Sequence, residues 1–218
     1  MAAITPEKDK LTCPAFNKTG SCIRGELCNK THKIVDIERC LCFHNLYPDP
    51  NLFEKALPDG VLEIPNEQKQ RMLDAFYLDV VLMLQQFGPV EDVVIAGNEV
   101  DHLSGNVLAM YREVDGALAA KTALDGQYYA GRKISITFSP TLRISSAICR
   151  SFDTDDCDKG NQCNFIHPLN PSPFVYTECF PQSLRKFPKK FRRGTQNGFV
   201  RDSPDDLIHG RTKMLRKN

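Results

Sequence analysis

Two segments of this chain carry nearly the same arrangement of cysteine and histidine residues. The first segment has the spacing C-x8-C-x5-C-x3-H and the second has the spacing C-x7-C-x5-C-x3-H. The candidate ligands are Cys13, Cys22, Cys28 and His32 in the first segment and Cys149, Cys157, Cys163 and His167 in the second. Two matching copies make chance cysteines in a small core a poor explanation. The spacing therefore predicts an internal repeat of two small metal-binding fingers.

Three thiolates and one imidazole suit a tetrahedral zinc ion. Four protein ligands leave no open position for a reactive water, so we expect two structural Zn²⁺ ions and no catalytic one. Fingers this short cannot bury a useful core, and metal binding must supply much of their folding free energy. The charged N-terminus, residues 1–10, lacks the apolar core of a signal peptide, which favours a reducing compartment and metal binding over disulfides.

The region between the fingers has the pattern of one α+β domain. We expect strands over 39–46, 90–95, 106–111 and 133–138, a loop over 48–65, and helices over 66–87 and 116–124. This order, βαββαβ, is that of a ferredoxin-like unit. Alternation in the first strand places Leu41 and Phe43 on one face and Cys40, Cys42 and His44 on the other.

The net charge of +1 hides a strong asymmetry along the chain. Residues 40–142 contain seven basic and 14 acidic residues, whereas residues 183–218 contain 11 basic and three acidic ones. An acidic middle and a basic tail favour two kinds of partner, although a solvated tail that only aids solubility explains the tail equally well. The longest apolar stretch, 76–84, is too short to span a bilayer, so no membrane partner is expected.

The expected helix at 66–87 is apolar around almost its whole circumference. Its apolar residues are Phe76, Tyr77, Leu78, Val80, Val81, Leu82, Met83 and Leu84. A helix packed on a sheet needs only one apolar stripe. We therefore expect the outer face to be covered, by a protein partner with an apolar anchor and positive charge or, alternatively, by residues 52–62 of the same chain.

The segments LCFHNL (41–46) and SGNVLAMY (104–111), in this element order, resemble the RNP2 and RNP1 strands of an RNA recognition motif. Members of that family that bind RNA stack bases on aromatic residues of the sheet surface. The corresponding positions here hold Cys42, Asn106 and Leu108, none of which has a ring. The sheet is therefore expected to be a poor RNA platform.

With a finger on each side of this domain, residues 5–168 resemble the small subunit of the U2 auxiliary factor (U2AF), a family of pre-mRNA splicing factors. The motifs that carry the resemblance are EKDK (7–10), NLYPDP (45–50), DHLSGNV (101–107) and CNFIH (163–167). It implies zinc fingers at 8–36 and 143–170, a U2AF homology motif at 39–142 and a basic tail at 171–218. It also implies a nuclear, spliceosomal protein that is not an enzyme.

The resemblance further implies a heterodimer with the large subunit of the auxiliary factor. In this family a short segment of the large subunit inserts a tryptophan between acidic residues of the first helix and an Arg-x-Phe loop. The matching candidates here are Asp74, Asp79, Gln127, Tyr128 and Tyr129. The arginine of the loop is replaced by Gln127, which weakens the electrostatic part of partner binding, while Tyr129 can still supply a ring.

In the same family the paired fingers bind single-stranded RNA at the AG dinucleotide of the 3′ splice site. The candidates that match this role are Phe16, Phe152 and Phe165 for stacking on bases, and Arg24, Asn29, Lys30, Arg150 and Lys159 for phosphates or base edges. A second interpretation makes Phe16 and Phe152 the small cores of their own fingers and leaves the basic residues solvated.

Other functions have less support. The chain shows no carboxylate pair, nucleophile with its base, or phosphate-binding glycine loop that would indicate an enzyme. A CCCH regulator of mRNA processing or turnover would need adjacent fingers, whereas 117 positions separate His32 from Cys149. Within the splicing interpretation, the closest alternative is the related minor-spliceosome small subunit. That protein is normally longer and carries Arg-Ser repeats, which are absent here.

The remaining cysteines have weaker claims to a site. Cys40, Cys42 and His44 can be imagined as a third metal site, but alternate positions on one strand converge poorly on a tetrahedral ion. We therefore favour a packing role on the sheet face. The sequence assigns no partner to Cys179.

Overall fold

The computed structural model describes residues 11–58, 61–152, 154 and 156–181. The helices are α1 (Pro14–Thr19), α2 (Pro50–Ala56), α3 (Asn66–Gln85), α4 (Val114–Leu124), α5 (Ile144–Ala147) and α6 (Pro173–Cys179), with 3-10 turns η1 (Gly25–Leu27) and η2 (Gly160–Gln162). The strands are β1 (Cys40–Phe43), β2 (Val90–Ala96), β3 (Val107–Tyr111), β4 (Tyr128–Tyr129), β5 (Arg132–Lys133), β6 (Ile136–Ser139) and β7 (Pro168–Leu169). The basic segment 183–218 and residues 1–10 lie outside the described residues.

The main sheet has the strand order β6-β1-β3-β2-β7 among the described residues, and every neighbouring pair is antiparallel. Its first four strands, with α3 after β1 and α4 after β3, form the βαββαβ unit, which confirms the ferredoxin-like expectation. In the centre, Leu41 lies opposite Ala109 on β3 and Phe138 on β6. The edge strand β7 comes directly after His167, so the second finger continues into the sheet.

Two expected elements differ from the structure. The last expected strand, 133–138, is divided: β5 pairs with β4 in a separate hairpin, and β6 joins the main sheet. The expected loop at 48–65 contains α2, which begins at Pro50 because the Asp49 carboxylate accepts a hydrogen bond of 2.9 Å from the Asn51 N–H.

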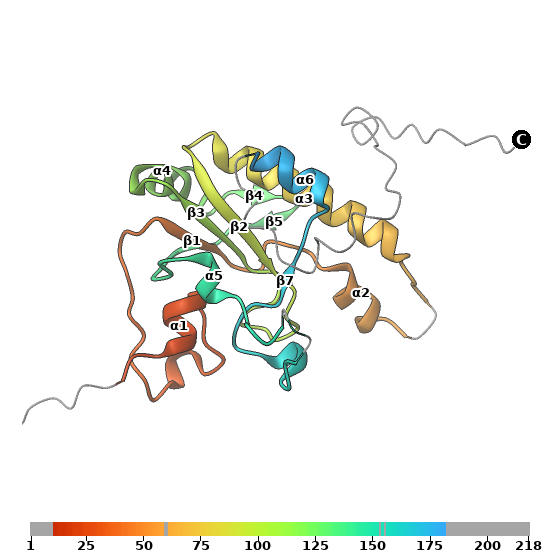
Figure 1. Ribbon diagram of the computed structural model, residues 1–218, viewed down its shortest axis with the longest axis horizontal. Coiled ribbons are helices and arrows are strands. Elements are labelled where there is room, and N and C mark those ends of the chain that lie inside the picture. The colour runs from red at the N-terminus through yellow and green to blue at the C-terminus, as the bar shows by residue number, and fades with distance from the viewer. Residues whose placement is uncertain (1–10, 59–60, 153, 155, 182–218) are drawn as a thin grey trace, which may run out of the picture.

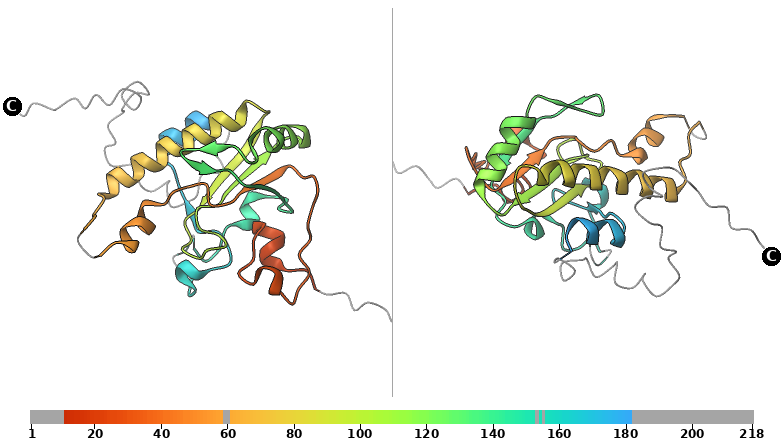
Figure 2. Two further views of the ribbon diagram at one scale, coloured as in Figure 1. Left: turned by 180° about the vertical axis from the view of Figure 1, so that it is seen from behind. Right: turned by 90° about the horizontal axis from the view of Figure 1, so that it is seen from above.

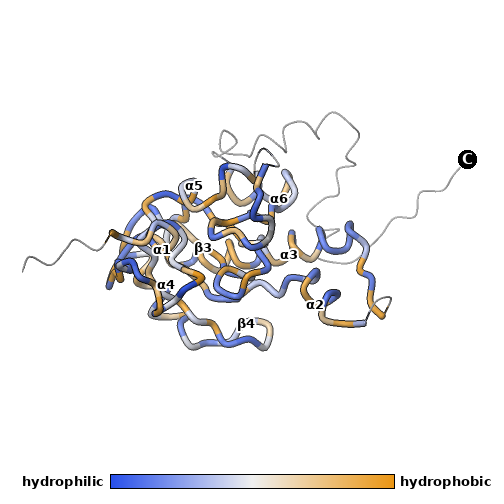
Figure 3. Tube along the Cα trace, turned by 90° about the horizontal axis from the view of Figure 1, so that it is seen from below, coloured by the Kyte–Doolittle hydropathy of each residue, from blue (hydrophilic) through white to orange (hydrophobic). Residues whose placement is uncertain are grey.

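The two faces of the sheet support different layers (Figure 1). Helices α3 and α4 cover the face that carries Leu41 and Phe43, whereas α1, α5 and both fingers lie on the opposite face with Cys40 and Cys42. The alternation predicted for β1 is therefore confirmed. Hydrophobic residues follow the strands in the middle of the molecule, including β3 (Figure 3).

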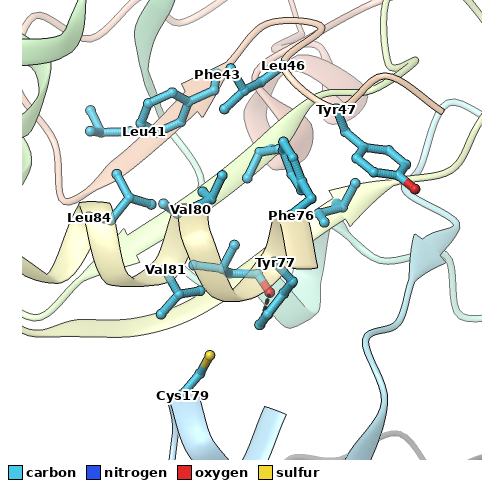
Figure 4. Packing of buried hydrophobic residues seen from close by; sticks show 14 of the residues in the cluster. Leu41, Phe43, Leu46, Tyr47, Phe76, Tyr77, Val80, Val81, Leu84 and Cys179 are labelled. Carbon is cyan, nitrogen blue, oxygen red and sulfur yellow. Dashed lines mark hydrogen bonds between the residues drawn. The ribbon is translucent and has the colours of Figure 1, made fainter. Parts of the chain in front are cut away.

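The long helix α3 is buried on two sides. Phe76, Val80 and Leu84 face the sheet, while Tyr77 and Val81 lie on the side where Cys179 of α6 packs (Figure 4). Helix α6 runs beside α3 in two further views (Figure 2).

This packing corrects the expectation for the side of α3 that carries Tyr77 and Val81, which neither a partner nor residues 52–62 cover. That face is covered by α6 and the residue that follows it: Val175, Tyr176 and Cys179 of the helix and the next residue, Phe180, belong to the same buried cluster. The Gln85 side chain also donates a 3.2 Å hydrogen bond to the Cys179 carbonyl. Within the described part of the chain, no helix combines the length and the hydropathy needed to cross a membrane.

Candidate metal centres and their surroundings

Each Cys/His repeat converges on one point. In both clusters the four candidate ligand atoms lie within 4.8 Å of one another. The Nε2 atoms of His32 and His167 are buried and have no hydrogen-bond partner among the described residues. Burial lowers the pKa of His167, which keeps its imidazole in the neutral form that a metal ion requires. Three sulfurs around an orphaned ring nitrogen fit a tetrahedral metal ion at each cluster.

The two fingers repeat in structure as well as in sequence. In each, a 3-10 turn begins at a glycine with positive φ, Gly25 (47°) or Gly160 (50°), and delivers the third cysteine. A short parallel bridge then joins the start of the finger to the residue before its histidine: Thr12 to Thr31, and Ile148 to Ile166. The backbone therefore brings the first ligand next to the fourth in both fingers.

An aromatic ring stacks on the ligand histidine in each finger. The Phe16 and His32 ring centroids are 4.3 Å apart at an interplanar angle of 4°, and those of Phe152 and His167 are 4.2 Å apart at 17°. Both phenylalanines are half-buried. The rings therefore take part in packing their fingers, as the small-core interpretation expects, and they also fix the orientation of the imidazoles.

The fingers lie side by side on the sheet although they are far apart in sequence (Figure 1). Lys18 of the first finger places its Nζ 5.3 Å from the ring centroid of Phe165 in the second. The Lys18 carbonyl accepts a 2.8 Å hydrogen bond from the Thr141 hydroxyl, just before α5. Phe165 is therefore next to a cation of the other finger.

The remaining RNA candidates are on the surface of the fingers. All four basic candidates are exposed, namely Arg24, Lys30, Arg150 and Lys159. The Arg24 guanidinium donates a 3.3 Å hydrogen bond to the Asn29 side-chain oxygen, so these two candidates lie together.

The sheet face that carries the RNP-like positions is inside the protein. Cys42 and Leu108 are 0% exposed and Asn106 is 2% exposed. Ile166 of the second finger packs in the same cluster as Leu108, and the Asn106 side chain donates a 3.4 Å hydrogen bond to the Ser21 hydroxyl of the first finger. Coverage by the fingers, as well as the missing rings, removes this face as an RNA platform.

Cys40 and Cys42 have the packing role expected of them. Neither belongs to a potential metal cluster among the described residues. Burial raises the pKa of Cys42 to about 12, and that of Cys40 further, so both remain thiols. The His44 Nε2 atom is instead 2.8 Å from the Thr137 hydroxyl.

The partner candidates divide into two groups. The Tyr129 hydroxyl donates a 2.6 Å hydrogen bond to the Asp79 carboxylate, and its ring meets Phe76 edge-on at 5.7 Å. Burial, followed by the nearby Asp79, raises the pKa of Tyr129, so the phenol remains a donor. Tyr128 is 73% exposed in the same hairpin.

Gln127 and Asp74 have structural contacts instead. The Gln127 backbone bonds to Leu124 and Ile134 at the base of the hairpin. The Asp74 carboxylate accepts a 2.6 Å hydrogen bond from the Ser172 N–H, and it thereby holds the segment that leads into α6. The structure thus brings Asp79 and Tyr129 together but places Asp74 toward α6.

The chain is similar to several proteins of known name. It is 33% identical to a U2af small-subunit splicing factor of Arabidopsis thaliana over 199 residues, covering 91% of this chain and 69% of the relative. It is 32% identical to the splicing factor U2AF 23 kDa subunit of Schizosaccharomyces pombe, covering 77% of this chain and 75% of the relative. It spans only 53% of a U2af small-subunit splicing factor of Oryza sativa subsp. japonica, at 34% identity.

Similarity to family models and to solved structures is weaker than similarity to these relatives. No protein-family model matches the chain. Among solved structures, the RNA15 RRM covers 50% of this chain and 98% of its own, with 17% identity and a TM-score of 0.30. The fold assignment therefore depends on the strand order described above.

Proposed function

Because this chain belongs to the U2AF small-subunit family of splicing factors, we propose that it is the small subunit of a nuclear heterodimer that binds single-stranded pre-mRNA at the AG of the 3′ splice site. Each finger holds one structural Zn²⁺ ion. The large subunit of the auxiliary factor is the partner, and the protein performs no catalysis.

The observation that carries this proposal is the contact between the two fingers. Lys18 and Phe165 meet across them, so a cation of the first finger and an aromatic ring of the second border one surface. Proteins that bind single-stranded RNA stack splayed bases on aromatic rings and neutralise the backbone with basic residues. Since the sheet face is covered, the paired fingers are the surface among the described residues that suits this role.

The RNA contacts are divided by chemistry. Phe165 stacks on a base, and Phe16 and Phe152 do so in addition to packing on the ligand histidines of their fingers. Arg24 and Asn29, which are already hydrogen-bonded to each other, are suited to a base edge because together they present donors and an acceptor. Lys30, Arg150 and Lys159 are exposed and meet phosphates.

The heterodimer interface is formed by α3 and the β4–β5 hairpin. Asp79 and Tyr129 lie at its centre, and Leu82 of α3 remains 52% exposed. A tryptophan of the large subunit packs against Tyr129, while basic residues of that segment pair with Asp79. With Gln127 in place of the family arginine, charge contributes less to this interface.

RNA titration tests the proposal directly. Fluorescently labelled single strands that contain or lack AG are titrated with the zinc-loaded full chain at several salt concentrations. We expect tighter binding to the AG strand and weak competition by duplex RNA. Phe16→Ala or Phe152→Ala should cost about 1–3 kcal/mol if the ring stacks on a base.

A pair of basic-residue variants separates specific from general charge effects. Lys159→Ala removes a proposed phosphate contact and should reduce the slope of log affinity against log salt by about one. Arg112→Ala removes an exposed arginine that follows β3, outside both fingers, and should leave the slope unchanged. Equal affinity of the wild type for both strands would remove the splice-site proposal.

Tighter binding to an AU-rich strand without AG would instead favour a regulator of mRNA turnover. That alternative is expected to need fingers that are close together in the chain. Here the fingers are distant in the chain, and the contact between Lys18 and Phe165 brings them together only in space.

A further inference from the structure

The two candidate metal centres are buried to different depths. In the second finger, the segment that supplies the third and fourth ligands has Cys163, Ile166 and His167 buried, at 3%, 0% and 4% exposure. In the first finger, the equivalent segment 28–32 has half-buried ligands and exposed residues between them. The same sequence motif therefore has two different surroundings.

One side chain of the central domain holds the second ligand segment. Asn98 follows β2 and is only 2% exposed. Its amide nitrogen donates hydrogen bonds of 3.0 Å to the carbonyls of Cys163 and Phe165. Its oxygen accepts a hydrogen bond of 2.8 Å from the His167 N–H. Three hydrogen bonds from Asn98 thus fix the backbone at the ligands Cys163 and His167 and at Phe165 between them.

The surrounding contacts extend this support. Gly97 donates its N–H to the His167 carbonyl at 2.8 Å, and Ile166 is fully buried in the cluster between sheet and fingers. A Cβ at Gly97, the residue after β2, would lie 2.6 Å from the Leu169 side chain and 3.2 Å from the His167 carbonyl oxygen, so a larger residue here would force this segment to shift. In the first finger, Thr31 exchanges backbone bonds with Leu11 and Cys13 of the same finger.

A metal ion leaves a structural site when its ligand segment opens. Opening the second segment breaks the Asn98 bonds and exposes Ile166 to water, whereas opening residues 28–32 moves a segment that is already exposed. Residues that orient ligands from outside the coordination sphere commonly change metal affinity by about 10–100-fold. Asn98 orients the ligand segment of the second finger in this way, from outside the coordination sphere.

We infer that the two fingers retain their metal ions unequally: the second is held by the central domain through Asn98, and the first is the exchangeable site. Asn98 is a positioning residue, since it contacts the ligand backbone and not the ion. The inference depends on metal binding by both clusters, which is part of the proposed function.

The experiment measures metal release with a separate readout for each finger. Elemental analysis first gives the zinc content of the full chain. An excess of a zinc-chelating dye is then added, and samples are alkylated with N-ethylmaleimide at timed intervals and mapped by mass spectrometry. The cysteines that report on the first finger are Cys13, Cys22 and Cys28, and those that report on the second are Cys149, Cys157 and Cys163.

We expect two phases, with the first-finger cysteines modified at least about tenfold faster than those of the second. The buried thiols of Cys40 and Cys42 report on global unfolding and should be modified last. Equal rates, or faster loss from the second finger, would overturn the inference while leaving metal binding intact. A zinc content near zero would instead refute metal binding itself.

Variants test the role of Asn98. Asn98→Ala should accelerate release from the second finger by about tenfold and leave the first phase unchanged. Asn106→Ala is the matched control: it removes an equally buried asparagine from the same β2–β3 connection, whose side chain bonds to Ser21 of the first finger. It should not accelerate the second phase.

If Asn98→Ala does not fold, Asn98→Asp keeps the acceptor for His167 and loses both donors. An unchanged second phase in a folded Asn98 variant would show that burial alone retains the ion, which would overturn the role of Asn98.

Discussion

Replacing Gly20 should separate the first finger from the sheet. Gly20 ends α1 with φ of +73°, a conformation that costs other residues about 1–2 kcal/mol. A Cβ here would also lie 2.9 Å from the Ser139 hydroxyl oxygen and 3.3 Å from the Ser139 Cβ. Ser139 cannot turn away freely, because it is fully buried and its hydroxyl lies 2.6 Å from that of Thr141.

The magnitude follows from these two contributions. Overpacking of a filled interior costs about 1–3 kcal/mol. Gly20→Ala should therefore lower the free energy of unfolding by about 2–5 kcal/mol in total. Gly25→Ala is the matched control, since it has φ of +47° and no atom within 4 Å of the new Cβ. It should cost only the backbone contribution, about 1–2 kcal/mol.

The assay is denaturant unfolding at a fixed zinc concentration. Because the chain has no tryptophan, far-UV circular dichroism is the suitable signal. Ser139→Ala in the Gly20→Ala background removes the closest atom and should recover part of the loss. Equal destabilisation by Gly20→Ala and Gly25→Ala, or no coupling to Ser139, would refute the close contact between finger and sheet.

Three other changes have distinct expected outcomes. Leu108→Ala should cost about 2–5 kcal/mol in unfolding experiments, because the side chain is fully buried, yet the folded variant should keep its RNA affinity in titrations. Tyr129→Ala combined with Asp79→Lys should weaken the affinity for the large subunit by several kcal/mol in calorimetry, and unchanged affinity would count against the interface. Cys163→Ala should unfold the second finger, with faster hydrogen exchange there but continued protection in α3.

The sequence predicted the elements whose signals are local. Ligand spacing located both Cys/His clusters, and period-two alternation assigned Leu41 and Phe43 to the helix-covered face. These predictions succeeded because each depends on a few neighbouring residues.

The helices α2 and α6 were missed although both have a recognisable start. Each begins with a capping residue followed by proline, Asp49-Pro50 and Ser172-Pro173. Proline-rich surroundings made these segments resemble a loop and the beginning of a tail. Because both helices are short, their apolar residues show little periodicity. The capping residue and the proline after it were therefore the main sequence signal for these helices.

The covered sheet face could be predicted only in part. The absence of rings at Cys42 and Leu108 indicated that bases do not stack there. That the fingers bury this face depends on contacts such as Lys18 with Thr141, which are 123 positions apart. No local pattern encodes such a pairing, because it depends on the shapes of two folded surfaces.

The same pairing has a consequence for the order in which the chain folds during synthesis. The first finger is made before the sheet and closes on its own backbone, through the bridge between Thr12 and Thr31. The surface that receives it is finished only when β6 and Thr141 have emerged, more than a hundred residues later. Leu108 and its neighbours on the sheet face gain their cover only later still, when Ile144 and Ala147 of α5 and Ile166 of the second finger have been made. A growing chain therefore exposes an apolar sheet face between the synthesis of β3 and that of Ile166, and we expect chaperones to bind this face in that interval.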